Sequence, residues 1–208
     1  MQIGDVIREL QKKRPVFHSE ADFQHALAWE IHMQNPSARV RLEINKGSAG
    51  KKERLDMFVL DGDQSYAIEL KYKTRKLNLA HDGEEFRLSN HGAQDTGRYD
   101  FVKDIGRLER FVHAHGNNLI GYAILLTNDD LYWKEAKRSL TADAGFRIHE
   151  GRVLNGELRW TEGTGAGTME NREVGHSLTG THTIRWADYS ELKGDGPGKF
   201  RYLILEIR

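Results

Sequence analysis

The stretch from Arg54 to Lys73, RLDMFVLDGDQSYAIELKYK, decides the fold predicted for this chain. Two runs rich in aliphatic, β-branched and aromatic residues, 54–60 and 65–73, flank the sequence Asp61-Gly62-Asp63. An Asp-Gly pair between two such runs is a strong hairpin signal, because glycine adopts the positive φ that tight hairpin turns require. The stretch therefore predicts two central β-strands joined by a tight turn.

Side-chain alternation along this hairpin brings two acids and a lysine to one face. A two-residue turn at Asp61-Gly62 places Glu69 diagonal to Asp56, and a four-residue turn places the two directly opposite each other. A three-residue turn without a bulge would separate them. With either of the first two turns, Lys71 lies on the same face as both acids.

This charged face also carries the apolar residues Phe58 and Leu60, which indicates that it is covered. Burying unpaired charge is costly, so Asp56, Glu69 and Lys71 need a partner or a function. The alternative interpretation is an exposed ladder, since charged and apolar residues also alternate on a solvated strand. Phe58 and Leu60 argue against that alternative.

A divalent metal gives the three charged residues a chemical role. Mg²⁺ is held by one or two carboxylates and keeps several waters for substrate phosphate, and Mn²⁺ can substitute for it. Asp56 and Glu69 are the candidate ligands, and Lys71 is the candidate to assist the attacking water or to offset developing negative charge. These residue types predict metal-assisted hydrolysis of a phosphodiester bond.

At these positions the chain resembles the PD-(D/E)XK nuclease superfamily. Asp56 matches the first acid of the motif and Glu69-Leu70-Lys71 matches its E-x-K, while Leu55 stands where a proline is expected. The resemblance covers about residues 19–127. It implies an α/β fold of the restriction-endonuclease-like type, with a central mixed β-sheet flanked by helices and extra C-terminal strands. It also implies a Mg²⁺-dependent endonuclease that cuts DNA.

A helix is predicted from Ser19 to about residue 35, with Ser19 as its N-cap. The resemblance implies that an acid near the start of this helix points at the metal site, and Glu20 matches it best, as a third ligand and catalytic residue. Gln24 lies one turn further along the same face. The alternative for Glu20 is a first-turn acid that complements the helix dipole.

The remaining chain alternates predicted strands and helices. A strand at 38–44 should lie beside the hairpin, and an apolar strand at 119–127 should run parallel to one hairpin strand after a helix at 98–115. The other predicted elements are an irregular loop at 74–97, a helix at 128–142, and short strands at 146–149, 152–160, 182–186 and 200–207. Asp100, Asp104 and Arg107 could brace the site, but the pattern favours a solvated helix face for them.

The formal charge is balanced, with 31 Lys plus Arg against 31 Asp plus Glu, so no general nucleic-acid coat is present. Basic residues nevertheless gather on both sides of the hairpin, which would suit a polyanion held over metal ligands. The alternative is that they serve solubility alone. The candidate nucleic-acid-binding residues are Lys46, Lys51, Lys52, Lys73 and Arg75.

The length of 208 residues fits one nuclease-like domain, 1–208, with a core at about 19–127 and a β-rich extension at about 145–208. The chain has no cysteine, no visible signal peptide and no long apolar run, so a cytoplasmic location without membrane insertion is the default expectation.

Two other functions stay open beside a DNA endonuclease. One is a non-catalytic module on the same fold that binds nucleic acid or protein, and the other is an RNA nuclease, since no RNA-reading motif separates the two substrates. If both strands of a duplex are cut, a homodimer is expected on symmetry grounds.

Overall fold

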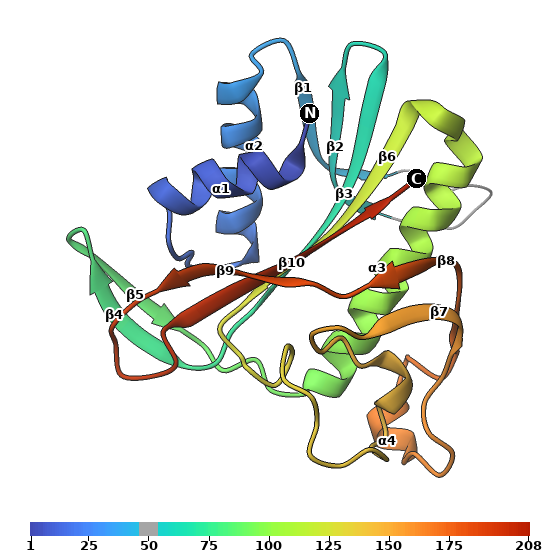
Figure 1. Ribbon diagram of the computed structural model, residues 1–208. Coiled ribbons are helices and arrows are strands. Elements are labelled where there is room, and N and C mark those ends of the chain that lie inside the picture. The colour runs from blue at the N-terminus through green and yellow to red at the C-terminus, as the bar shows by residue number, and fades with distance from the viewer. Residues whose placement is uncertain (46–53) are drawn as a thin grey trace.

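A mixed six-stranded sheet with helices on both faces forms the centre of the computed structural model, which describes residues 1–45 and 54–208 (Figure 1). The sheet order is β1-β2-β3-β6-β10-β9. Its strands are β1 (Arg39–Asn45), β2 (Arg54–Asp61), β3 (Gln64–Lys73), β6 (Leu119–Thr127), β9 (Trp186–Glu191) and β10 (Lys199–Ile207). Two separate hairpins pair β4 (Leu77–His81) with β5 (Glu84–Leu88) and β7 (Val153–Leu158) with β8 (His176–Thr183). The helices are α1 (Ile3–Lys13), α2 (Glu20–Gln34), α3 (Gln94–His115) and α4 (Ala166–Met169), with 3-10 turns η1 (Gly116–Asn118) and η2 (Ala144–Phe146). The coarse α/β prediction is confirmed.

The predicted central hairpin is present, with its turn one residue later than Asp61-Gly62. Asp61 pairs with Gln64, so the turn residues are Gly62 and Asp63, and Gly62 has a φ of 59°. The resulting register is the one that the longer turn predicted. The last pair of the two strands is Met57↔Ile68, and the next position in the same register places Asp56 opposite Glu69.

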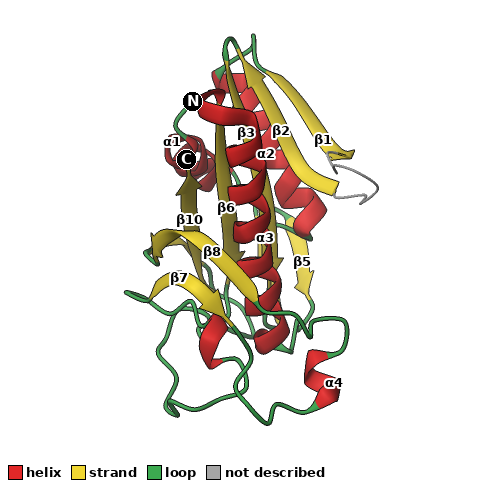
Figure 2. Cartoon of the chain, turned by 90° about the vertical axis from the view of Figure 1, so that its right-hand side faces the viewer, coloured by secondary structure: helices red, strands yellow, loops and turns green. Residues whose placement is uncertain are grey.

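Strand β6 runs parallel to β3 over its full length, as the helix between them predicted, from the Ser65↔Leu119 pair to Lys73↔Thr127. All nine β6 residues are buried, which fits a strand covered on both faces. Helix α3 lies along one face of the sheet, with β7 and β8 crossing it (Figure 2). No helix in the described part of the chain, α3 included, is long and apolar enough to cross a membrane.

Two hydrophobic cores lie on opposite faces of the sheet. On one face α1 and α2 pack with Phe23 and Leu27 against strand residues such as Ile68 and Leu70. On the other face α3 packs against the alternate strand residues and against the β7–β8 hairpin. Because Phe58 and Ala67 belong to this second core, the charged face of the central hairpin is the face that α3 covers.

Several predicted elements differ in the structure. The segment 74–97 is not an irregular loop but contains the β4–β5 hairpin and the first turn of α3. The predicted helix at 128–142 is absent, because Asp129 Oδ1 accepts a hydrogen bond from the backbone N–H of Leu131 and so favours a turn. No strand forms at 146–149, and the chain changes from β8 to β9 within the strand expected at 182–186.

The last strand returns to the sheet as predicted. Strand β10 pairs antiparallel with β6 from Arg201↔Thr127 to Ile207↔Gly121, and its other edge pairs with β9. Strands β9 and β10 therefore complete the central sheet, whereas β7 and β8 form a separate hairpin.

Gly121 of β6 gives a test of this packing. A Cβ atom there would lie 3.2 Å from Val112 Cγ2 of α3 and 3.3 Å from Ile207 Cβ of β10. We expect Gly121→Val to lower the free energy of unfolding by about 1–3 kcal/mol, because overpacking forces neighbours to move. Gly165→Val is the control, since a Cβ there meets open space. Denaturant unfolding measures both, and equal stability of the two variants would contradict the close packing.

Candidate active site

The candidate site lies where β2 separates from β3. Their pairing ends at Met57↔Ile68, which leaves the backbone N–H groups of Leu70 and Tyr72 without a strand partner. Carboxylates replace the missing strand: Asp56 Oδ2 accepts from Leu70 N at 2.7 Å, and Glu20 Oε2 accepts from Tyr72 N at 2.7 Å. N–H groups two residues apart on a strand are roughly 7 Å apart, so the two acids line one open strand edge.

Helix α2 contacts β2 at the point where the β2–β3 pairing ends. Gln24 Nε2 donates to the backbone carbonyl of Asp56 at 2.6 Å and to Glu43 Oε1 at 2.9 Å. Glu43 has a φ of 53°, and the pairing of β1 with β2 skips Glu43 and Asp56. Ser19 caps α2 as predicted, accepting from Asp22 N, and this fixes the first turn that carries Glu20.

Helix α3, which lies on the face of the sheet opposite to α2, contributes two charged residues to the site. Lys71 Nζ lies 2.7 Å from Asp104 Oδ2, and Arg107 forms a short ion pair with Glu69. Asp104 Oδ1 also lies 3.0 Å from Arg107 Nη2, which links the two pairs. The expectation that Asp104 and Arg107 occupy a solvated helix face is therefore wrong.

A signal for Asp104 was present in the sequence. It follows the apolar stripe residue Phe101 by three positions and precedes Leu108 by four, which is the spacing of a buried helix face. Asp104 is only 5% exposed. A carboxylate at such spacing indicates a buried partner, and here that partner is Lys71.

We call these six residues the carboxylate cluster: Glu20, Asp56, Glu69, Asp104, Lys71 and Arg107. Four acids face two cations, so among the described residues the cluster has two negative charges in excess when all are ionised. Burial, reinforced by the carboxylates of Asp104 and Asp56, raises the pKa of Glu69 to about 10, against the opposing effect of Arg107 and Lys71. Burial likewise raises the pKa of Asp104.

The short ion pair of Glu69 with Arg107 belongs to the ionised carboxylate, whereas the raised pKa favours the neutral acid. Burial among more acids than cations makes the upward direction the physically expected one. For Lys71, burial lowers the pKa, but the nearby charges of Asp104, Asp56 and Glu20 outweigh burial and raise the pKa above its usual value. Lys71 is therefore an ammonium group at neutral pH.

The donor set fits a hard divalent cation in part. Glu69 is 1% exposed; its Oε2 is ion-paired with Arg107, and its Oε1 has no hydrogen-bond partner among the described residues. Asp56 uses Oδ2 for Leu70 N, so its other oxygen is available to a ligand. Within 1–45 and 54–208, however, no three His, Asp or Glu side chains are grouped closely enough to hold a metal ion. Glu20 is thus near the two candidate ligands but does not complete a three-ligand set in this arrangement.

The predicted nucleic-acid-binding residues fall into two groups. Lys46, Lys51 and Lys52 lie outside the described residues. Lys73 lines a cavity of about 400 Å³ together with Glu20, beside the open edge of β3. Arg75 lies two residues further on, with Nη1 3.4 Å from Asp130 Oδ1.

Comparisons with protein-family models, with curated proteins and with solved structures found no match to this chain.

Glu69 gives a prediction about stability. Its pKa in the folded protein, about 10, exceeds the ordinary value of 4.5, so between these values the folded state retains a proton that the unfolded state loses. The contribution of Glu69 to stability is therefore fully present below about pH 4.5 and is lost as the pH rises toward 10. Glu69→Gln should remove this loss, because the amide stays neutral and still accepts a hydrogen bond from Arg107.

We expect the Tm of Glu69→Gln in metal-free buffer to exceed that of the wild type at pH 8 by about 2–4 °C or more, the shift that roughly 1 kcal/mol produces in a domain of this size. The difference should shrink at pH 5. Thermal denaturation at both pH values measures it, with the exposed Glu157→Gln as control. A variant less stable than the wild type at pH 8 would show that ionised Glu69 stabilises the fold.

Proposed function

We propose that this protein is a metal-dependent endonuclease that hydrolyses phosphodiester bonds of DNA, on a restriction-endonuclease-like fold. The observation that carries the proposal is the convergence of Asp56, Glu69 and Lys71 at the end of the β2–β3 pairing. Two features support a catalytic over a structural role. Glu69 is buried with one carboxylate oxygen, Oε1, that has no hydrogen-bond partner among the described residues, and the carboxylate cluster holds four acids against two cations.

Asp56 and Glu69 would hold the metal ion, with Mg²⁺ as the natural choice for oxygen ligands and Mn²⁺ as a substitute. When bound, such an ion supplies a Lewis acid for a phosphoryl oxygen and lowers the pKa of a water molecule. The backbone N–H of Leu70 donates to the carboxylate of Asp56, and the side chain of Gln24 donates to its backbone carbonyl. Asp56 is therefore positioned before any ligand arrives.

Lys71 would act through its positive charge. Because its pKa is raised, it is not a base that removes a proton from water. An ammonium group beside the carboxylates can instead donate a hydrogen bond to the attacking water or offset the charge that develops on the phosphoryl oxygens. Asp104 holds Nζ of Lys71 at 2.7 Å and so positions it.

The second candidate is a non-catalytic binding module on the same fold. The ion pairs of Lys71 with Asp104 and of Glu69 with Arg107 favour it, since they satisfy both charges without a metal. The excess of acids over cations speaks against it, because a purely structural cluster has no need for that excess.

The cleavage test uses purified protein with Mg²⁺ or Mn²⁺ and supercoiled plasmid, with an RNA substrate of the same sequence in parallel. We expect Lys71→Ala and Asp56→Ala to lower the rate of nicking by at least about 100-fold, because each removes a group that acts on the transition state. Lys12→Ala, an exposed residue of α1, is the control. Equal nicking by wild type and both variants would exclude the assigned residues, and cleavage of RNA alone would change the substrate.

Metal binding separates the two candidates directly. We expect calorimetric titration with Mn²⁺ to show saturable binding to the wild type that Asp56→Asn and Glu69→Gln each weaken by about tenfold or more, as each removes a charged ligand. Asp104→Asn is the matched control, since Asp104 binds Lys71 and is not a proposed ligand. Absence of saturable binding in the wild type would favour the binding module.

A further inference from the structure

The segment after β6 forms a basic surface that the sequence did not predict. Strands β3 and β6 are parallel and end side by side, with Lys73 paired with Thr127. The segment after β6 therefore starts at the same end of the sheet as the segment after β3. Ligands of α/β sheets bind at the carboxyl ends of the strands. Within residues 130–138, which we call the basic loop, the side chains of Lys134, Lys137 and Arg138 are exposed.

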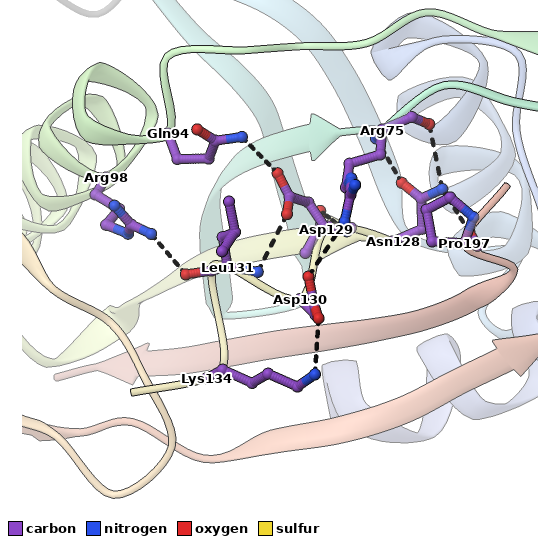
Figure 3. A network of polar contacts seen from close by, with 10 residues as sticks. Arg75, Gln94, Arg98, Asn128, Asp129, Asp130, Leu131, Lys134 and Pro197 are labelled. Carbon is purple, nitrogen blue, oxygen red and sulfur yellow. Dashed lines mark hydrogen bonds and ion pairs between the residues drawn. The ribbon is translucent and has the colours of Figure 1, made fainter. Parts of the chain in front are cut away.

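The loop is held in place by buried polar contacts (Figure 3). Asn128 accepts from Arg75 N at 2.7 Å and donates to Pro197 O at 2.8 Å. Asp129 Oδ2 accepts from Gln94 Nε2 at 2.8 Å. Arg98 of α3, which is 5% exposed, donates to Leu131 O and pairs with Asp143. These contacts fix residues 128–131, where the chain leaves β6 and the basic loop begins.

A cavity of about 800 Å³ lies beside the loop, and positive charge prevails in its lining. Five cations line it against three acids: Arg98, Lys134, Lys137, Arg138 and Arg147 against Asp95, Asp130 and Glu135. Among the described residues, the structure shows no ion pair or hydrogen bond for the side chains of Lys137 and Arg138. Arg98 and Arg147 both pair with Asp143, and Lys134 pairs with Asp130, so Lys137 and Arg138 are the cations beside the cavity that favour an anionic ligand.

The basic loop is continuous with the candidate site. Arg75 Nη1 lies 3.4 Å from Asp130 Oδ1, and Lys134 Nζ lies 2.7 Å from Asp130 Oδ2, so one acid bridges the two cations. Arg75 follows Lys71 by four residues, a span of at most about 13–14 Å of extended chain. A ligand that contacts both Lys71 and Arg75 must carry several negative charges over a length of that order.

We infer that the basic loop binds the phosphate backbone of the same polynucleotide whose scissile bond lies at the carboxylate cluster. The inference relies on the proposed function for the identity of the polyanion. A duplex presents one phosphate per strand about every 3.4 Å, so the span corresponds to a few base pairs. Contacts of this kind position the duplex and do not read its sequence. The protein then acts on polynucleotides and not on dinucleotides or terminal phosphates.

The test is fluorescence anisotropy with a labelled duplex several helical turns long, without divalent metal, at several salt concentrations. We expect Lys137→Ala/Arg138→Ala to raise the Kd about tenfold and to reduce the slope of log K against log salt by about 1–2, as one or two phosphate contacts are lost. Arg8→Ala/Lys12→Ala on α1 removes the same charge from exposed positions and should change neither quantity. Far-UV circular dichroism confirms that both double variants are folded.

The outcomes separate this inference from the proposed chemistry. Weaker binding by the double variant at unchanged Lys71-dependent cleavage of a very short duplex supports both. Weaker binding with no cleavage by any protein supports the basic loop and removes the nuclease. Wild-type affinity and slope in the double variant, or equally strong competition by polyglutamate and by unlabelled duplex, would overturn the assignment to a nucleic-acid backbone.

Discussion

The early end of the β2–β3 pairing is the constraint on which the candidate site depends. A hairpin that paired to the end of β3 would satisfy the N–H groups of Leu70 and Tyr72 with strand carbonyls. Here pairing ends at Met57↔Ile68, and the carboxylates of Asp56 and Glu20 accept those two N–H groups. Unpaired buried N–H groups are costly, so the open strand edge favours carboxylates that can accept from them. The same geometry can therefore serve stability and ligand binding together.

Helix α3 determines how much charge the interior must accommodate. Asp104 and Arg107 lie one turn apart, and each reaches a charged residue of β3. Burial of these groups is tolerated because opposite charges alternate across the cluster, but the acids outnumber the cations. Buried ion pairs contribute little to stability compared with apolar packing. The two buried acids, Glu69 and Asp104, are each paired with a cation, so the acids in excess are the exposed Glu20 and the half-buried Asp56, which a ligand can reach.

The sequence predicted the parts of this arrangement that depend on local pattern. Alternation brought Asp56, Glu69 and Lys71 to one face, and the continuous apolar run of β6 predicted its parallel position. The rotation of α3 about its axis could not be predicted with equal certainty, because polar and apolar residues share its buried side, and so Asp104 was placed in solvent. The sequence predicts a helix at 128–142, where Leu131, Trp133 and Leu140 are apolar. The side chains of Asn128 and Asp129 instead bind backbone groups at the exit of β6, an effect of tertiary contacts with Arg75 and Gln94 that periodicity does not contain.

The position of β10 has a consequence for synthesis on the ribosome. Strand β6 is apolar throughout, and one of its two edges is paired by a strand that follows it by some seventy residues in the sequence. During translation that edge is exposed until Lys199–Ile207 has left the exit tunnel, so the nascent chain carries an unpaired hydrophobic strand edge for several seconds at ordinary elongation rates. Strand β9 precedes β10 in the chain but joins the sheet only through it, so β9 can pair only once β10 is in place.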